Sequence, residues 1–164
     1  MIRVLLADDN EFVRTAIAEL FHSTGDIAVV AECSDGNAVL GAVEQAAPDV
    51  VVLDLAMPGR TGLEAARDLL SADPGARILM LTGNPSPAAV REAQQIGVGG
   101  YVLKGEDPTE LIGHVRAVAA GGQAWSPSLL TSGAGSSGNM PPNCAVSYYA
   151  ESRHGTNVPA DTVN

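Results

Sequence analysis

Five polar residues in this chain of 164 residues could together handle a phosphoryl group. They comprise three carboxylates, one hydroxyl and one ammonium: Asp8, Asp9, Asp54, Thr82 and Lys104. Clustered carboxylates repel one another unless a hard cation binds among them, and Mg²⁺ suits one or two carboxylates with waters and a phosphoryl oxygen. An aspartate can itself attack phosphorus, and a cation and a lysine can neutralise the charge that would repel the incoming group. The set therefore predicts a site that makes and holds an aspartyl phosphate.

Asp54 is the most unusual member of the set because it follows an uninterrupted apolar run. The stretch VVVLDLAMPGRTG, residues 50–62, places this acid directly after four strand-forming residues. A buried charge without a partner would cost several kcal/mol there, so we expect Asp54 to open onto a solvent-accessible acidic pocket. Taken alone, an aspartate at a strand end is equally consistent with a simple cap of the following turn.

The elements that would position these side chains alternate between strand and helix. Short stretches rich in Val, Ile and Leu predict five strands, at residues 2–7, 27–33, 49–54, 77–82 and 100–104. Longer segments with helix start signals lie between them. Alternation of this kind predicts an α/β fold with a parallel, doubly wound (βα)5 sheet. Ligands of such sheets bind beyond the carboxyl ends of the strands, which is where the polar residues fall.

The helix start signals are specific at two places. Thr61 and Glu64 have the spacing of a capping box. Ser86 precedes Pro87, an arrangement typical of a capping residue followed by the first residue of a helix. Both signals support helices that follow strands directly.

The chain changes character after about residue 121. Residues 1–122 form the predicted domain, whereas residues 123–164 are rich in Gly, Ser, Asn and Pro and show no sustained apolar period. We expect this second part to be a largely disordered linker or tail. It shows no recognisable helix-turn-helix pattern.

Composition narrows the class of partner and the compartment. The net charge of -10 argues against non-specific binding of nucleic acid or an anionic membrane. No apolar run approaches the roughly 18 residues of a membrane span. The two cysteines fit neither a metal motif nor a disulfide framework, so a reducing, cytoplasmic location is expected.

Taken in order, these residues resemble the receiver domain of bacterial two-component response regulators. The resemblance covers roughly residues 2–120 and rests on Asp8 and Asp9, Asp54 in LDLAMPGRTGLEA, Thr82 in LMLTG and Lys104 in YVLKG. The stretches ADDNEFVRTAIAELF and MPGRTGLEA are similar to the LuxR/NarL/FixJ-type subfamily. The family implies a flavodoxin-like fold whose five parallel strands have the order 2-1-3-4-5.

The resemblance also implies how the acidic residues act. Asp54 would accept a phosphoryl group from a sensor histidine kinase. Asp9, Asp54 and the backbone carbonyl of Ala56 would bind Mg²⁺ directly, and Asp8 would act mostly through water. Lys104 would pair with a phosphoryl oxygen. The protein would be a phosphoacceptor rather than an enzyme, with at most self-phosphorylation and autodephosphorylation.

A switch pair and the partners follow from the same resemblance. After phosphorylation Thr82 would move toward the phosphoryl group and the ring of Tyr101 would turn inward. The changed surface would alter pairing with a partner, with a homodimer that can depend on phosphorylation as the family expectation. The process served would be transcription regulation, without direct nucleic-acid or membrane binding by this chain.

Three other functions use similar parts. A phosphatase of the haloacid dehalogenase type would need a second aspartate where Ala56 stands. A flavodoxin-like FMN carrier would need a phosphate-cradling loop after the first strand, and the acidic DDNEF there would repel a phosphate. A receiver that works as an interaction module without phosphorylation stays open, because the NPSP loop at residues 84–87 could limit the switch motion.

Overall fold

A computed structural model describes residues 1–131 of the chain. The predicted disorder of residues 132–164 lies outside this described part. The elements in chain order are β1 (Ile2–Ala7), α1 (Glu11–Thr24), β2 (Ile27–Cys33), the 3₁₀ turn η1 (Gly36–Ala38), α2 (Val39–Ala46), β3 (Val50–Asp54), α3 (Gly62–Ala72), β4 (Ile78–Thr82), α4 (Pro87–Ile96), β5 (Gly100–Leu103), α5 (Pro108–Ala119), β6 (Ala124–Trp125) and α6 (Pro127–Thr131). The five predicted strands and the alternation with helices are confirmed.

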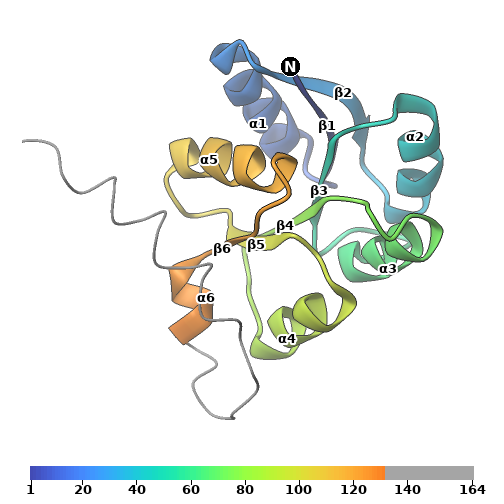
Figure 1. The fold of residues 1–164 in the computed structure, drawn as a ribbon, viewed down its shortest axis with the longest axis vertical. Helices are drawn as coiled ribbons and strands as arrows, with labels where there is room; N and C mark the ends of the chain where they lie inside the picture. The colour runs from blue at the N-terminus through green and yellow to red at the C-terminus, as the bar shows by residue number, and fades with distance from the viewer. Residues whose placement is uncertain (132–164) are drawn as a thin grey trace, which may run out of the picture. The chain divides into compact units, whose positions relative to one another are not determined.

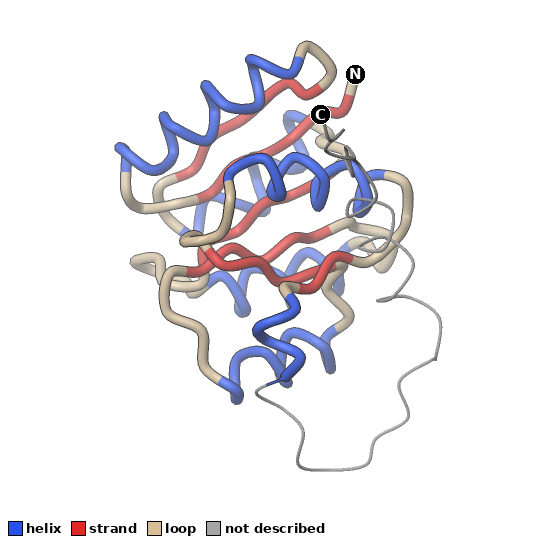
Figure 2. The backbone as a smooth tube through the Cα atoms, turned by 90° about the vertical axis from the view of Figure 1, so that its left-hand side faces the viewer, coloured by secondary structure: helices blue, strands red, loops and turns tan. Residues whose placement is uncertain are grey.

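The strands form one parallel sheet in the order β2-β1-β3-β4-β5-β6. Helices α1 and α5 cover one face, and α2, α3 and α4 cover the other (Figure 1). Figure 2 shows the strands side by side between these two helical layers. The doubly wound α/β fold and the order 2-1-3-4-5 are therefore confirmed.

Strand β3 shows why continuous apolar sequence suits this sheet. Successive side chains of a strand point to opposite faces. Val50 and Val52 pack in the core beneath α1 and α5, and Val51 and Leu53 pack in the core beneath α2, α3 and α4. Because both faces are covered, the strand has no solvent side until it reaches Asp54 at its end.

Local capping fixes where the helices begin. The capping box of Thr61 and Glu64 forms as predicted, with the Thr61 Oγ1 accepting from the Glu64 N–H and the Glu64 carboxylate accepting from the Thr61 N–H. Ser86 caps α4 ahead of Pro87, also as predicted. These caps fix the first residues of α3 and α4, directly after the loops that follow β3 and β4.

The sheet has one strand more than predicted. Ala124 and Trp125 form β6, which pairs with β5 through Gly100↔Ala124 and Tyr101↔Trp125. The short helix α6 follows, and its Leu129 is buried in the core beneath α4. The folded part thus continues past residue 122, where the sequence placed the start of the linker, because a two-residue strand leaves no periodic signal.

Among residues 1–131, no helix has the length and apolar character needed to cross a membrane.

The contact between β5 and β6 predicts the effect of one added methyl group. A Cβ at Gly100 would lie 2.0 Å from the carbonyl oxygen of Ala124, a backbone atom that cannot rotate away. We expect Gly100→Ala to lower the free energy of unfolding by about 1–3 kcal/mol in urea denaturation, as overpacking does.

Gly113 provides the matched control. It lies inside α5, and nothing stands within 4 Å of a Cβ added there. Gly113→Ala is expected to raise the free energy of unfolding by up to about 1 kcal/mol, because alanine favours the helix. Equal changes in the free energy of unfolding for the two substitutions would show that β6 is not closely packed against Gly100 of β5.

Candidate functional site

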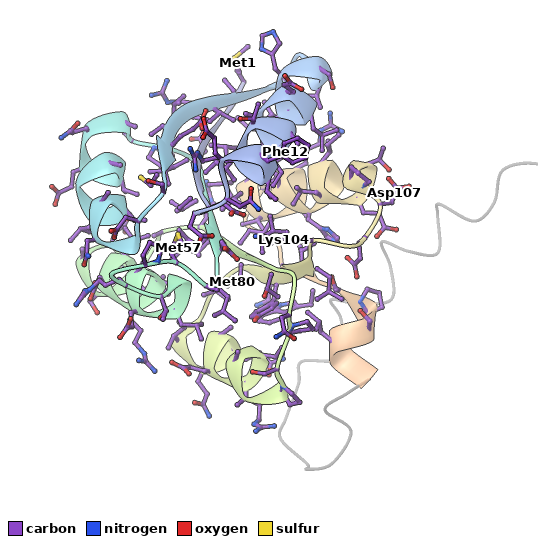
Figure 3. The ribbon with its side chains drawn as sticks, turned by 180° about the vertical axis from the view of Figure 1, so that it is seen from behind. Met1, Phe12, Met57, Met80, Lys104 and Asp107 are labelled. Atoms are coloured by element: carbon purple, nitrogen blue, oxygen red, sulfur yellow. The ribbon has the colours of Figure 1, made fainter. Side chains whose placement is uncertain are left out.

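The carboxyl ends of the strands bring the predicted polar residues to one edge of the sheet. Asp8 follows β1, Asp54 ends β3, Thr82 ends β4 and Lys104 follows β5. Asp54 pairs in register with Leu81, and Thr82 pairs with Leu103. In Figure 3 Lys104 lies near the middle of the view, with Phe12 of α1 above it and Met57 of the loop after β3 to its left.

The three aspartates form one acidic cluster. Each offers a carboxylate oxygen, and these three oxygens lie within 4.8 Å of one another. Asp8 is fully buried and Asp54 is only 5% exposed, whereas Asp9 is exposed. The predicted open acidic pocket is therefore wrong for Asp54, which is a buried carboxylate at the base of the cluster.

Lys104 compensates the two buried charges. Its Nζ lies 2.6 Å from the Asp8 Oδ2 and 3.2 Å from the Asp54 Oδ1. Burial lowers the pKa of Lys104, but its hydrogen bond with Asp8 and the charges of Asp54 and Asp8 outweigh burial and raise that pKa. The lysine is thus held as an ammonium between two carboxylates.

The charge of Asp54 remains disfavoured despite this partner. Burial and the negative charge of Asp8 raise the pKa of the Asp54 carboxyl, while Lys104 and the N–H of Ala56 act in the opposite direction. Since the net shift is upward, the folded protein would gain stability if the negative charge on Asp54 were neutralised or shared with further positive charge.

The loop after β1 is held by contacts that the sequence did not reveal. The Asp8 Oδ1 accepts from the Asn10 N–H at 2.9 Å, and the Asp8 carbonyl accepts from Arg14 Nη1 at 2.7 Å. Arg14 also pairs with Glu32 on β2 at 3.0 Å. Arg14 therefore fixes the backbone that carries Asp8 and Asp9, and nothing in the sequence distinguishes it from other helix surface residues.

The loop after β3 is fixed by close packing. Gly62, the first residue of α3, lies so near the end of β3 that a Cβ there would be 2.2 Å from the Asp54 carbonyl oxygen. Ala56 lies two residues after Asp54 and is exposed. Its backbone carbonyl as a metal ligand stays a prediction.

The predicted switch residues lie on neighbouring strands. Thr82 is buried, and its Oγ1 accepts from the Asn84 N–H at 3.2 Å. Tyr101 is fully buried, and its ring stacks on Trp125 with centroids 6.5 Å apart. Burial raises the pKa of the Tyr101 hydroxyl, and the nearby Thr82 hydroxyl opposes this shift. The Tyr101 ring therefore already lies inward, whereas the family resemblance implies an inward turn only after phosphorylation.

The acidic cluster has the donor set that Mg²⁺ prefers. Oxygen ligands of one Mg²⁺, with bonds of about 2.1 Å, lie within about 4.2 Å of each other. The carboxylate oxygens of Asp8, Asp9 and Asp54 lie within 4.8 Å of one another, so Asp9 and Asp54 are near enough to hold one ion after a small adjustment, with Asp8 within reach of a water on that ion. The raised pKa of Asp54 fits a site that gains from added positive charge.

Comparison with known proteins identifies the family. Residues 4–116 match the response regulator receiver domain, and the chain belongs to this family. It is 40% identical over 124 residues to the response regulator UvrY of Escherichia coli, which covers 74% of this chain and 56% of UvrY. It is 35% identical over 130 residues to the transcriptional regulatory protein DesR of Bacillus subtilis, which covers 79% of this chain and 64% of DesR. The chain thus spans less than two thirds of these relatives.

Solved structures agree with the fold and the subfamily. A two-component response regulator of the LuxR family from an Aurantimonas species superposes with a TM-score of 0.78 at 36% identity, covering 82% of this chain and 96% of that one. The isolated receiver domain of RcsB from Salmonella enterica superposes with a TM-score of 0.73 at 26% identity, covering 79% and 96%. The resemblance to LuxR/NarL-type receivers is confirmed.

The raised pKa of Asp54 predicts a pH-dependent effect of its neutral isostere. The pKa of the Asp54 carboxyl is higher in the folded protein than its ordinary value of 3.8. Such a carboxyl makes the folded protein less stable as the pH rises from the unfolded pKa through the folded pKa. Asp54→Asn is uncharged at every pH. We therefore expect it to be more stable than wild type at pH 7 in metal-free buffer, with the difference vanishing below about pH 4.

Chemical denaturation at a series of pH values measures this difference. Asp68→Asn, which removes the same formal charge from an exposed pair with Arg60, is the control and should change stability by less than about 1 kcal/mol. An Asp54→Asn variant that is less stable than wild type at pH 7 would show that the pair with Lys104 outweighs burial.

Proposed function

We propose that this chain is the phosphorylation-controlled switch of a two-component phosphorelay, and that Asp54 accepts a phosphoryl group from a sensor histidine kinase. One observation carries the proposal. A buried carboxylate ends the central strand β3, its pKa is raised, and it shares the Lys104 ammonium with Asp8. A structural cap of a turn would need neither the second buried acid nor the lysine.

The transfer step uses residues already in place. A carboxylate oxygen of Asp54 attacks the phosphorus of a phosphohistidine and forms the new P–O bond. The P–N bond breaks, and its electron pair remains on the imidazole nitrogen of the kinase. The Lys104 ammonium, now 3.2 Å from Asp54, offers its hydrogen bonds to the phosphoryl oxygens. This contact takes the place of the pair between Lys104 and the Asp54 carboxylate, whose own negative charge is lost when the acyl phosphate forms.

Mg²⁺ is the proposed cofactor. Asp9, Asp54 and the Ala56 carbonyl would hold it directly, and Asp8 would contribute mostly through water. When bound, the ion supplies positive charge that lowers the repulsion between the carboxylates and the phosphoryl oxygens. Asp9 suits this role because its carboxylate is exposed within the cluster.

The same residues favour a phosphoacceptor over an enzyme with an independent substrate. A phosphatase with an aspartate nucleophile would need a general acid two residues after Asp54, where the side chain is the methyl of Ala56. The chemistry of this chain would then be limited to its own phosphorylation and autodephosphorylation.

The readout is proposed to pass through Thr82 and Tyr101. Phosphorylation adds about -1.5 to -2 charge and three acceptor oxygens, which would draw the Thr82 hydroxyl from its contact with Asn84. The changed surface would control pairing with a second copy of the chain. A role in transcription regulation is supported by the names of relatives such as the transcriptional regulatory protein DesR. A cytoplasmic location, without direct binding of DNA or membrane by residues 1–131, is part of the proposal.

Intact-mass measurement tests the phosphoacceptor function. With Mg²⁺ and acetyl phosphate, wild type is expected to gain one phosphoryl group, and Asp54→Asn to gain none. Chelation of the metal should prevent the gain, and Lys104→Ala should slow it by about tenfold or more, since one charge-assisted contact to the phosphoryl group is lost.

Asp68→Asn serves again as the matched control and should be phosphorylated like wild type. The absence of an adduct with both acetyl phosphate and phosphorylated kinases would favour an interaction module that works without phosphorylation. Steady turnover of unrelated phosphate esters would contradict the phosphoacceptor function.

A further inference from the structure

The segment after α5 touches the predicted switch residue directly. Trp125, the single tryptophan of the chain, stacks on the Tyr101 ring with an interplanar angle of 18°. The two residues are partners in the pairing of β5 with β6. Any change in the position of the Tyr101 ring must therefore be accommodated by Trp125.

Ser126 ties the same segment to the loop that carries Lys104. It is fully buried, and its N–H donates to the Tyr101 carbonyl at 3.0 Å. Its Oγ accepts from the Leu103 N–H at 3.3 Å and donates to the Glu106 Oε2 at 2.7 Å. The residues on both sides of Lys104 and Gly105 are thus bonded to one buried hydroxyl.

Lys104 is also held by Thr82, the other predicted switch residue. Its own N–H donates to the Thr82 carbonyl at 2.8 Å, and its Nζ reaches Asp8 and Asp54. The path from the acidic cluster to Ser126 therefore consists of one lysine side chain and the backbone on either side of it.

We propose that Trp125 and Ser126 are positioning residues of the switch, so that the phosphorylation state of Asp54 and the placement of the β6–α6 junction control each other. The proposal rests on the proposed function of Asp54 and adds to it a route by which the signal leaves the domain. Helix α6 directly follows this junction, so the switch would set the position of α6.

The energetics favour coupling over independent motion. A hydrogen bond from Ser126 to the Glu106 carboxylate is charge-assisted and stronger than one between neutral groups. Breaking it would leave the buried Ser126 hydroxyl without its acceptor, which is costly. When Lys104 moves to a phosphoryl group, the Leu103–Glu106 loop is thus expected to move together with Ser126. Because coupling between two equilibria is reciprocal, loosening Ser126 changes the free energy of placing Lys104 against a phosphoryl group, and we expect the phosphorylation of Asp54 to change with it.

Tryptophan fluorescence, recorded in parallel with intact mass, tests whether Trp125 responds to the phosphorylation of Asp54. Addition of acetyl phosphate and Mg²⁺ is expected to change the emission of Trp125 in step with the gain of the phosphoryl group. Asp54→Asn, which cannot be phosphorylated, should show neither change and controls for effects of the reagents on the fluorophore.

Substitutions at Glu106 test whether the contacts of Ser126 affect the phosphorylation of Asp54, and they leave the buried Ser126 hydroxyl itself in place. Glu106→Ala removes the acceptor of Ser126 and is expected to slow phosphorylation by about threefold to tenfold, as loss of a charged hydrogen bond does. It should also weaken the fluorescence change. Glu106→Gln keeps a carbonyl acceptor and should restore both readouts. Glu110→Ala, which removes an exposed charge from the first turn of α5, is the matched control and should behave like wild type.

The outcomes separate the proposal from the function on which it rests. No mass gain in wild type would overturn the proposed function. A normal mass gain with unchanged Trp125 emission, or equal rates for Glu106→Ala and Glu110→Ala, would overturn the coupling and leave Asp54 as the phosphoacceptor. A stability loss in Glu106→Ala without a change in rate or emission would likewise show that the Ser126 contacts are only structural.

Discussion

The ion pair between Lys104 and two buried carboxylates is the interaction on which the site depends. Asp8 and Asp54 are both removed from solvent, and Lys104 Nζ lies 2.6 Å and 3.2 Å from their oxygens. Two like charges buried side by side would otherwise oppose folding. The parallel sheet makes the pairing possible, because the carboxyl ends of β1, β3 and β5 all lie at the same edge of a parallel sheet. Lys104 neutralises part of the charge of the two carboxylates, so any group that brings its own charge to this edge of the sheet changes the forces on Lys104.

The same ion pair links the charge state of Asp54 to the position of the loop that carries Lys104. Burial keeps the pKa of Asp54 raised, so the site is held in an electrostatically unfavourable state that added positive charge or covalent modification relieves. Lys104 can move toward a phosphoryl group because its charge lies at the end of a long, flexible side chain, whereas the carboxylates of Asp8 and Asp54 lie close to the backbone. The N–H of Lys104 itself donates to the Thr82 carbonyl, and its chain neighbours Leu103 and Glu106 are hydrogen-bonded to the Ser126 hydroxyl. A local change of charge can thereby become a displacement at the edge of the sheet beside β5.

Much of the fold and the site could be predicted from the sequence because the signals are local. Apolar runs ending in Asp8, Asp54, Thr82 and Lys104 predicted strands and a shared edge, while the strand order came from the family resemblance. Contacts between distant residues left no such signal. The bridge of Lys104 to both buried acids, the support of Asp8 by Arg14 and the stacking of Trp125 on Tyr101 all depend on tertiary packing. Strand β6 was not predicted because two residues in a stretch rich in Gly and Ser are too few to show an alternation of apolar and polar side chains.

Site mapping of the phosphoryl group tests the role of Asp54 most directly. Borohydride reduces an acyl phosphate to the alcohol and releases phosphate, so a phosphorylated aspartate becomes homoserine. Phosphorylated protein treated in this way, digested and sequenced by tandem mass spectrometry is expected to carry homoserine at position 54. Homoserine at Asp8 or Asp9, or at none of the three acids in protein whose intact mass shows the adduct, would contradict the assignment of Asp54 as the phosphoacceptor.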